Sequence, residues 1–212
     1  MSQKQSFFTK YATEIVLFFL FLYAFLPFLS PILLSNDIES SVGRGIQRVY
    51  SFFCHQRVDR SLFLFGGEDS QYFYTFEELK DVGYISERLD FAPGYPFWGN
   101  EDLGFKVAYC IRDVAIYSSF VFWGFVLVMF MNAKGKLIKF SWAVIIILAL
   151  PMALDGTFQT LASAFDISWA PDYYMESNLK RLITGILFGM ALAMAIFPHL
   201  KEACGLGYNE DQ

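Results

Sequence analysis

Residues 12–34 read ATEIVLFFLFLYAFLPFLSPILL, and this stretch decides the fold class. A helix needs about 20 apolar residues to cross a hydrocarbon core of ~30 Å. Three further apolar stretches of sufficient length follow, at about residues 108–131, 137–162 and 179–198. The sequence therefore predicts an all-α membrane protein with four transmembrane helices, in which residues 1–212 form a single membrane domain.

The composition supports this fold class and argues against a nucleic-acid-binding protein and a disulfide scaffold. Hydrophobic residues make up 55% of the chain, including 25 Phe, whereas soluble domains are nearer 45–50% apolar. The net charge of −5 and the lack of a basic stripe argue against a nucleic-acid partner. Three cysteines are too few for a disulfide scaffold. The sequence therefore predicts that the chain lies in, and contacts, the lipid bilayer.

Lysines in the short flanks of the spans predict the orientation, because they stay on the cytoplasmic side. Lys4 and Lys10 precede the first span, and the link between the second and third spans contains Lys134, Lys136 and Lys139. The link between the third and fourth spans is acidic. We expect a multi-pass protein of the cell membrane with both termini cytoplasmic and the long 35–109 segment extracytoplasmic.

The long 35–109 segment divides into two parts. Residues 36–57 carry apolar side chains at helical spacing, which predicts an amphipathic helix in the membrane interface. A helix packed on top of the bundle fits the same pattern. Residues 66–103 are polar, acidic and turn-rich, and predict a small extracytoplasmic insertion.

With this orientation, polar residues from four segments reach the outer interface. Cys110 and Asp113 are three residues apart, as are Asn178 and Arg181, and such spacings share a helix face. Ionisable groups within spans usually face the bundle interior and pair with one another. Asp155 lies inside the third span, so it needs a partner, for which Arg181 is the candidate. The alternative is that these residues only cap and staple the bundle.

The residue types of this constellation suggest roles for a catalytic or binding site. We predict catalytic roles for Asp113, Asp155 and His55. Cationic and amide groups suit substrate binding, and we assign that role to Arg57, Arg112, Gln159, Asn178 and Arg181. Thiolate and imidazole ligands suit a transition metal such as Zn, which gives Cys54, His55 and Cys110 as metal ligands.

The two outer cysteines are open to other interpretations. In an oxidising compartment, Cys54 and Cys110 could form a structural disulfide. They could also be free or redox-active thiols, whose thiolate form nearby arginines would favour.

Cationic residues also gather around the outer interface, where the topology does not require them: Arg44, Arg48, Arg57, Arg60, Arg112, Lys180 and Arg181. Guanidinium groups bind phosphate through two hydrogen bonds at once. An anionic lipid headgroup is therefore a candidate ligand, and ordinary pairing with acidic neighbours is the alternative.

Five sequence stretches carry a resemblance to a known family: Cys54-His-Gln-Arg, Arg60-Ser-Leu-Phe-Leu-Phe-Gly, Cys110-Ile-Arg-Asp with Tyr117, Pro151-Met-Ala-Leu-Asp-Gly-Thr-Phe-Gln159 and Ser177-Asn-Leu-Lys-Arg-Leu-Ile-Thr-Gly185. Together they resemble a group of predicted prokaryotic membrane proteins, the domain of unknown function two-thousand-and-eighty-five. The resemblance covers roughly residues 45–66 and 104–190, and it implies a membrane protein without a particular reaction.

The chain departs from the family pattern in two places. The acidic segment 67–103 looks inserted, and Asp113 stands where the family pattern has a Cys. A carboxylate at that position favours a metal site over a dithiol.

Two classes of function fit the sequence. One is a membrane-embedded enzyme or binder with its site at the outer interface. The other is a non-enzymatic accessory subunit of a membrane complex, with Cys54–Cys110 as a structural disulfide. A transporter is disfavoured because four spans without a visible repeat do not match the usual transporter architecture.

Overall fold

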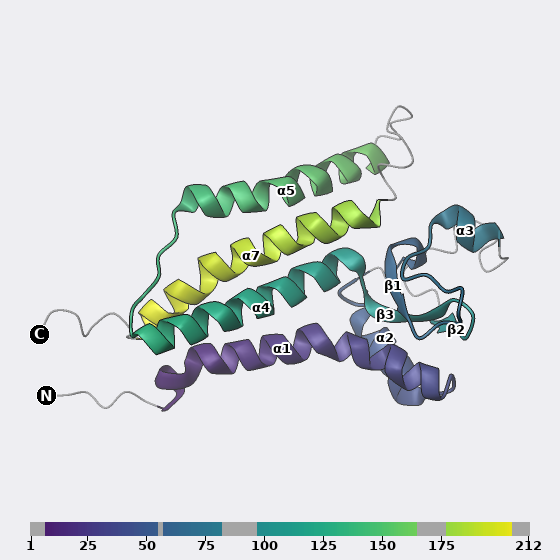
Figure 1. The fold of residues 1–212 in the computed structure, drawn as a ribbon, viewed down its shortest axis with the longest axis horizontal. Coiled ribbons are helices and arrows are strands. Elements are labelled where there is room, and N and C mark those ends of the chain that lie inside the picture. The colour runs from purple at the N-terminus through teal and green to yellow at the C-terminus, as the bar shows by residue number, and fades with distance from the viewer. Residues whose placement is uncertain (1–6, 55–56, 82–96, 165–176, 205–212) are drawn as a thin grey trace, which may run out of the picture. The chain divides into compact units, whose positions relative to one another are not determined.

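The computed structural model describes residues 7–54, 57–81, 97–164 and 177–204. Four long helices run through these ranges (Figure 1): α1 Phe7–Asn36, α4 Ile111–Lys134, α5 Trp142–Ala164 and α7 Asn178–Ala203. Each contains a segment long and apolar enough to cross a membrane. The four predicted spans are thus confirmed, and the second begins at Ile111 rather than at residue 108.

The second span starts later because a strand precedes it. An antiparallel sheet has the strand order β1–β3–β2. Its strands are β1 Ser61–Leu64, β2 Gly99–Asn100 and β3 Gly104–Cys110. The remaining elements are α2 Ser41–Tyr50, the 3-10 turn η1 Val58–Arg60 and α3 Phe76–Asp81. The sheet was not predicted from the sequence.

Internal contacts divide the chain into two compact units. The first unit contains Met1–Ala24, Ala115–Leu161 and Ile183–Gln212. The second contains Phe25–Val114 and Ala162–Leu182. The first unit is therefore built from parts of the four long helices, and the second holds the sheet and the short helices.

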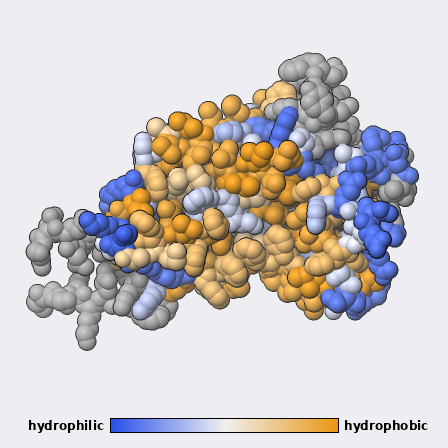
Figure 2. All heavy atoms as spheres, viewed as in Figure 1, coloured by the Kyte–Doolittle hydropathy of each residue, from blue (hydrophilic) through white to orange (hydrophobic). Residues whose placement is uncertain are grey.

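The core of the first unit lies among α1, α4 and α7. Leu17 of α1 packs with Phe120 and Met131 of α4 and with Phe197 of α7. Large apolar side chains also remain exposed along these helices, as expected for surfaces that face lipid. Figure 2 shows hydrophobic residues over most of the visible face of the long helices.

Gly189 sets the close approach of α4 and α7. A Cβ atom at this position would lie 2.3 Å from the backbone oxygen of Ile116. Beside it, the hydroxyl of Ser119 donates a hydrogen bond of 2.8 Å to the backbone oxygen of Ile186. Small residues at such contacts let helix backbones approach closely in membranes, so this contact depends on the absence of a side chain.

A buried lysine of the first unit is paired with a glutamate. Lys201, which is buried, donates to Glu14 at 2.6 Å, and Asn132 donates to the same carboxylate oxygen at 3.0 Å. This pairing joins α1, α4 and α7 and agrees with the high cost of unpaired charges in a membrane.

In the second unit, a buried polar network ties α1, α2 and β3 together. The hydroxyl of Ser30 donates to the backbone oxygen of Gly43 and accepts from the amide of Gln47. The same Gln47 amide donates to the backbone oxygen of Lys106 at 2.6 Å. Because Gln47 and Ser30 are almost fully buried, these bonds fix α2 against its neighbours.

Helix α2 is shorter than the predicted 36–57 helix. Ser40 caps its N-terminus by accepting from the backbone N–H of Gly43. One face is buried through Ile46 and Tyr50, whereas Val42 and Val49 are exposed, and Phe52 and Phe53 follow in an exposed turn. An apolar exposed face suits a membrane interface, and this location stays a prediction.

The described part of the predicted 66–103 insertion packs on the sheet. Thr75 and Glu78 form a reciprocal capping box at the start of α3. Behind it, Tyr74 and Leu79 are buried together with Phe63 of β1. The hydroxyl of Tyr74 donates to the backbone oxygen of Leu103, which holds the two ends of this segment together.

Candidate functional site

Two cysteines meet where β3 runs into α4. Cys110 is the last residue of β3, and β3 pairs it with Ser61 of β1. Cys54 follows the turn after α2 and is buried. Its sulfur accepts a hydrogen bond of 3.3 Å from the backbone N–H of Cys110. The strand pairing thus brings together two thiols that are far apart in the sequence.

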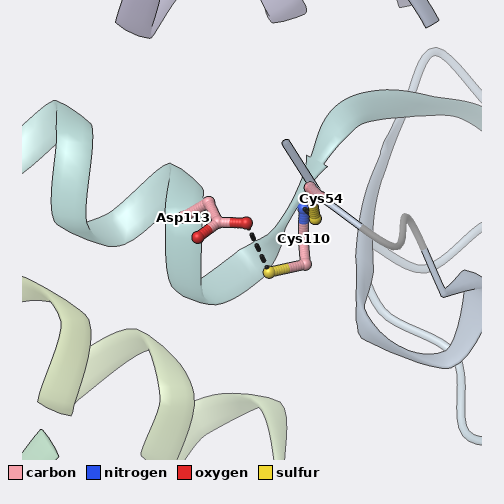
Figure 3. A group of neighbouring side chains, drawn as sticks. All are labelled: Cys54, Cys110 and Asp113. Atoms are coloured by element: carbon pink, nitrogen blue, oxygen red, sulfur yellow. Dashed lines mark hydrogen bonds between the residues drawn. The ribbon is translucent and has the colours of Figure 1, made fainter. Parts of the chain in front are cut away.

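Asp113 completes a cluster of three possible ligands. It lies in the first turn of α4, where the helix dipole favours a negative charge. The Cys110 thiol donates to its Oδ2 atom at 3.0 Å (Figure 3). The ligand atoms of Cys54, Cys110 and Asp113 all lie within 4.8 Å of one another. We refer to these three residues as the thiol–carboxylate cluster.

The surroundings of Cys110 raise the pKa of its thiol. Its hydrogen bond with Cys54 raises the pKa of the Cys110 thiol well above the ordinary value, and burial and the nearby charge of Asp113 act in the same direction. Lys106 is buried in the same strand, and burial lowers its pKa to about 8. The Cys54 thiol opposes that lowering, so Lys106 lies within electrostatic range of the cluster.

The two cysteines are not bonded to each other. Their side chains lie 3.7 Å apart, and both are free thiols in this structure. A disulfide requires ~2.05 Å between sulfur atoms. The predicted disulfide is therefore absent here, and forming it would require the two sulfur atoms to approach each other.

The spacing of the cluster fits a tetrahedral metal. With Zn–S bonds of ~2.3 Å, two sulfur ligands of tetrahedral zinc are about 3.8 Å apart, close to the 3.7 Å observed. The 3.0 Å between the Cys110 sulfur and Asp113 would widen to about 3.5 Å. Such an adjustment is within the reach of a side-chain rotation. Thiolate and carboxylate ligands together suit a borderline cation.

A second polar group surrounds Asp59, which is buried within η1. Arg57 donates to both carboxylate oxygens of Asp59, at 3.1 and 3.0 Å, and Arg60 lies 3.7 Å from Oδ2. The backbone oxygen of Asp59 accepts a bond of 3.0 Å from the Asn178 amide. Asp59 therefore joins η1 to the start of α7.

Four guanidinium groups share this region. Arg181 donates to the Asn178 side chain at 3.0 Å and is only 1% exposed. It lies within electrostatic range of Arg57, Arg60 and Arg112 as well as Asp59. The pKa of Arg60 is lowered by burial and then by the positive charge of Arg57. We refer to Arg57, Arg60, Arg112 and Arg181 as the arginine cluster.

A comparison with protein families matches part of the chain that carries this geometry. Residues 102–195 match the family described as predicted membrane protein (DUF2085). The match confirms the family resemblance over the three later sequence motifs, and residues 45–66 lie outside it. Comparison with curated proteins and with solved structures gives no match.

The DUF2085 match thus covers some predicted site residues and leaves out others. Cys110, Arg112 and Asp113 lie within it, as do Asn178 and Arg181. Cys54 and Arg57 lie outside it, although the structure brings Cys54 to Cys110 and Arg57 to the arginine cluster. The site therefore combines residues from inside and outside the DUF2085 region.

The remaining predicted site residues are not placed at either cluster. His55 lies outside the described residues. Asp155 and Gln159 belong to the first unit, where the Gln159 amide donates to both oxygens of Asp155 at 3.1 Å. Asp155 thus has a partner one helical turn away. Its predicted pairing with Arg181, like the catalytic and substrate-binding roles, stays a prediction.

Sequence reasoning missed Asp59 and Lys106. Asp59 stands between Arg57 and Arg60, and this alternation of charges could have signalled an ion-pair turn. Lys106 lies within the apolar run GFKVAYC. A lysine in a buried strand is unusual, and this contrast could have identified it.

Proposed function

We propose that this integral membrane protein binds a transition metal such as Zn²⁺ through Cys54, Cys110 and Asp113 at the extracytoplasmic interface. One observation carries the proposal: three ligand atoms of metal-binding types lie within 4.8 Å of one another. The tetrahedral fit of the two cysteines supports it further. A structural pair of thiols would not need the carboxylate.

Three protein ligands are typical of a catalytic metal site. Catalytic zinc sites use three side chains and keep a fourth position for water or substrate, whereas structural sites are closed. His55 follows Cys54 directly and is the candidate for closing the site as a fourth ligand. A metal bound here would supply Lewis acidity. The residues are consistent with a metal-dependent enzyme and with a metal-dependent binder.

The first test is the metal content of the protein purified without chelators. We expect about one Zn²⁺ per chain in the wild type and its loss in Cys54→Ala and Cys110→Ala, because each variant removes a thiolate ligand. Cys204→Ala is the matched control, since Cys204 lies in the first unit, and it should retain the metal. The measurement is elemental analysis of the purified protein.

The same preparation distinguishes the rival function. An accessory subunit with Cys54–Cys110 as a structural disulfide would yield metal-free protein whose two thiols react with a thiol reagent only after reduction. That result would contradict the metal site. Metal-dependent protection of both thiols, reversed by a chelator, would support it.

We also propose that both termini are cytoplasmic and that the site faces outward, on the basis of the lysines that flank the spans. In a Cys204→Ser background, an impermeant thiol reagent added to intact cells should label Glu68→Cys above the level of the background protein, which keeps Cys54 and Cys110, and should leave Lys136→Cys at that level. Both positions are exposed, so accessibility is matched. Labelling of Lys136→Cys alone would reverse the proposed orientation.

A further inference from the structure

A row of large apolar side chains stays exposed along α2 and its flanks. Val42 and Val49 lie seven residues apart in α2, so they share one face of the helix. The row continues at spacings of three or four residues on either side of them. We refer to the whole row as the apolar stripe: Ile38, Val42, Val49, Phe52 and Phe53. Its side chains are 49% to 88% exposed, and a contiguous apolar surface of this kind marks an interaction site.

The two phenylalanines belong to the stripe because the turn after α2 continues the helix. Ser51 keeps helical backbone angles. The N–H groups of Phe52 and Phe53 donate to the backbone oxygens of Val49 and Tyr50, at 3.4 and 3.0 Å. Phe52 is 88% exposed as a result. An aromatic side chain in that position gains free energy when it moves from water into an apolar surrounding.

The polar side chains of α2 lie on a different face from the stripe. Arg48 is exposed and Arg44 partly exposed, and neither is aligned with Val42 or Val49. The Arg44 guanidinium lies 4.9 Å from the centre of the Trp98 ring. Arginine and tryptophan side chains are typical of the headgroup level of a membrane. The combination of an apolar stripe and a basic edge therefore fits a lipid surface.

Contacts with α1 place α2 at the border of the hydrocarbon. Ser30 of α1 donates to the backbone oxygen of Gly43 and accepts from Gln47, both at 3.0 Å. Ser30 lies six residues before the end of the candidate span Tyr11–Asn36, or about 9 Å along the helix axis. A span of 26 residues is about 39 Å long, so it extends about 4–5 Å beyond each side of a hydrocarbon core of ~30 Å. Ser30 and its partners in α2 are then about 4–5 Å inside the hydrocarbon.

We propose that the apolar stripe inserts into the leaflet around the C-terminal end of α1 and binds the acyl chains of phospholipids. The stripe continues a surface that already faces lipid, since Leu29 and Ile32 of the same stretch of α1 are exposed. Arg44 and Arg48 lie at the level of the phosphate groups. Cys54 directly follows Phe53, so the inserted turn holds the thiol–carboxylate cluster beside the lipid surface.

This surface contains none of the three proposed metal ligands, so the inference goes beyond the metal site and is tested without it. The photoreactive residue p-benzoylphenylalanine replaces one side chain at a time. Each protein is placed in nanodiscs of phosphatidylcholine that include phosphatidylcholine with an alkyne on its acyl chain. After irradiation, the lipid bound to the protein is coupled to an azide dye and measured by fluorescence in a gel.

Matched positions make the result specific. Phe122 of α4 is 60% exposed on a span and gives the level for full lipid contact. Tyr72 is 68% exposed, as Phe53 is at 67%, but it lies in the polar stretch after β1. We expect positions 52 and 53 to bind at least about fivefold more lipid than position 72, because only the stripe is surrounded by acyl chains.

The neighbouring positions 48 and 49 test the orientation of α2 within one helix. Position 49 should crosslink to lipid strongly and position 48 weakly, since the two lie about 100° apart around the helix. Equal crosslinking at 48 and 49 would overturn the proposed insertion. So would lipid crosslinking at position 52 that is no higher than at position 72, or crosslinks from position 52 to protein in place of lipid.

Discussion

Gly189→Leu is expected to lower the unfolding midpoint of the protein in detergent by about 6–12 °C, because overpacking a tight contact costs about 3 kcal/mol. The reason lies in the contact of α7 with α4. A Cβ atom at residue 189 already meets the backbone oxygen of Ile116 at 2.3 Å, and that oxygen cannot rotate away as a side chain could. The two helices must separate.

A graded series tests this explanation. Gly189→Ala should destabilise less than Gly189→Leu, and both should weaken the neighbouring bond from Ser119 to Ile186. Gly45→Ala is the matched control, since a Cβ atom there meets nothing within 4 Å and alanine favours a helix by roughly 0.5–1 kcal/mol. Equal midpoints for Gly189→Leu and the wild type would show that α4 and α7 do not pack as described.

Asp59→Asn is expected to cost about 2–3 kcal/mol, or about 5–10 °C of the unfolding midpoint. The substitution keeps the shape of the side chain and leaves the backbone oxygen that Asn178 contacts. It removes the negative charge that Arg57 binds through two hydrogen bonds. The cost is below the 3–5 kcal/mol of a fully buried pair, because Arg57 is a third exposed.

Glu39→Gln provides the comparison for Asp59→Asn. Glu39 pairs with Arg44 at 2.8 Å, and its side chain is 75% exposed. Exposed ion pairs contribute roughly 0–1 kcal/mol, so the midpoint should hardly change. The measurement is the thermal unfolding midpoint of both variants in the same detergent. A similar loss in both variants would mean that Asp59 is not the hub of a buried network.

The spans could be predicted from the sequence because one physical rule decides them. The bilayer demands long apolar helices, and residues 12–34 and the three later stretches meet that demand without reference to one another. The sheet could not be predicted in this way. Strand β3 reads GFKVAYC, an apolar run that continues into α4, so hydropathy alone assigned its last residues to the span.

The candidate site could be predicted only in part, because local spacing indicates some of its contacts and long-range pairing makes the others. The helical spacing of Cys110 and Asp113 suggested that they meet, and they do, although Cys110 belongs to a strand and not to the helix. Cys54 reaches them through the pairing of Ser61 with Cys110, a long-range contact that no local pattern encodes. Asp59 pairs with its sequence neighbours Arg57 and Arg60, but its contact with Asn178, which is distant in the sequence, could not be predicted from a local pattern.

The direct pairing of β1 with β3 determines where the sequence can be altered without moving Cys54 and Cys110. The chain between Leu64 and Gly104 connects the two strands at one end of this pairing, whereas Cys54 and Cys110 meet at the other. The entropy of closing a loop grows only slowly with its length. Tyr74 and Leu79 of this connection pack on the sheet and Gly99 pairs with it, so these contacts must be kept. The exposed turn at Glu68 and Asp69 could be lengthened while the two thiols keep their positions, and it is a suitable place to insert a foreign epitope or affinity tag.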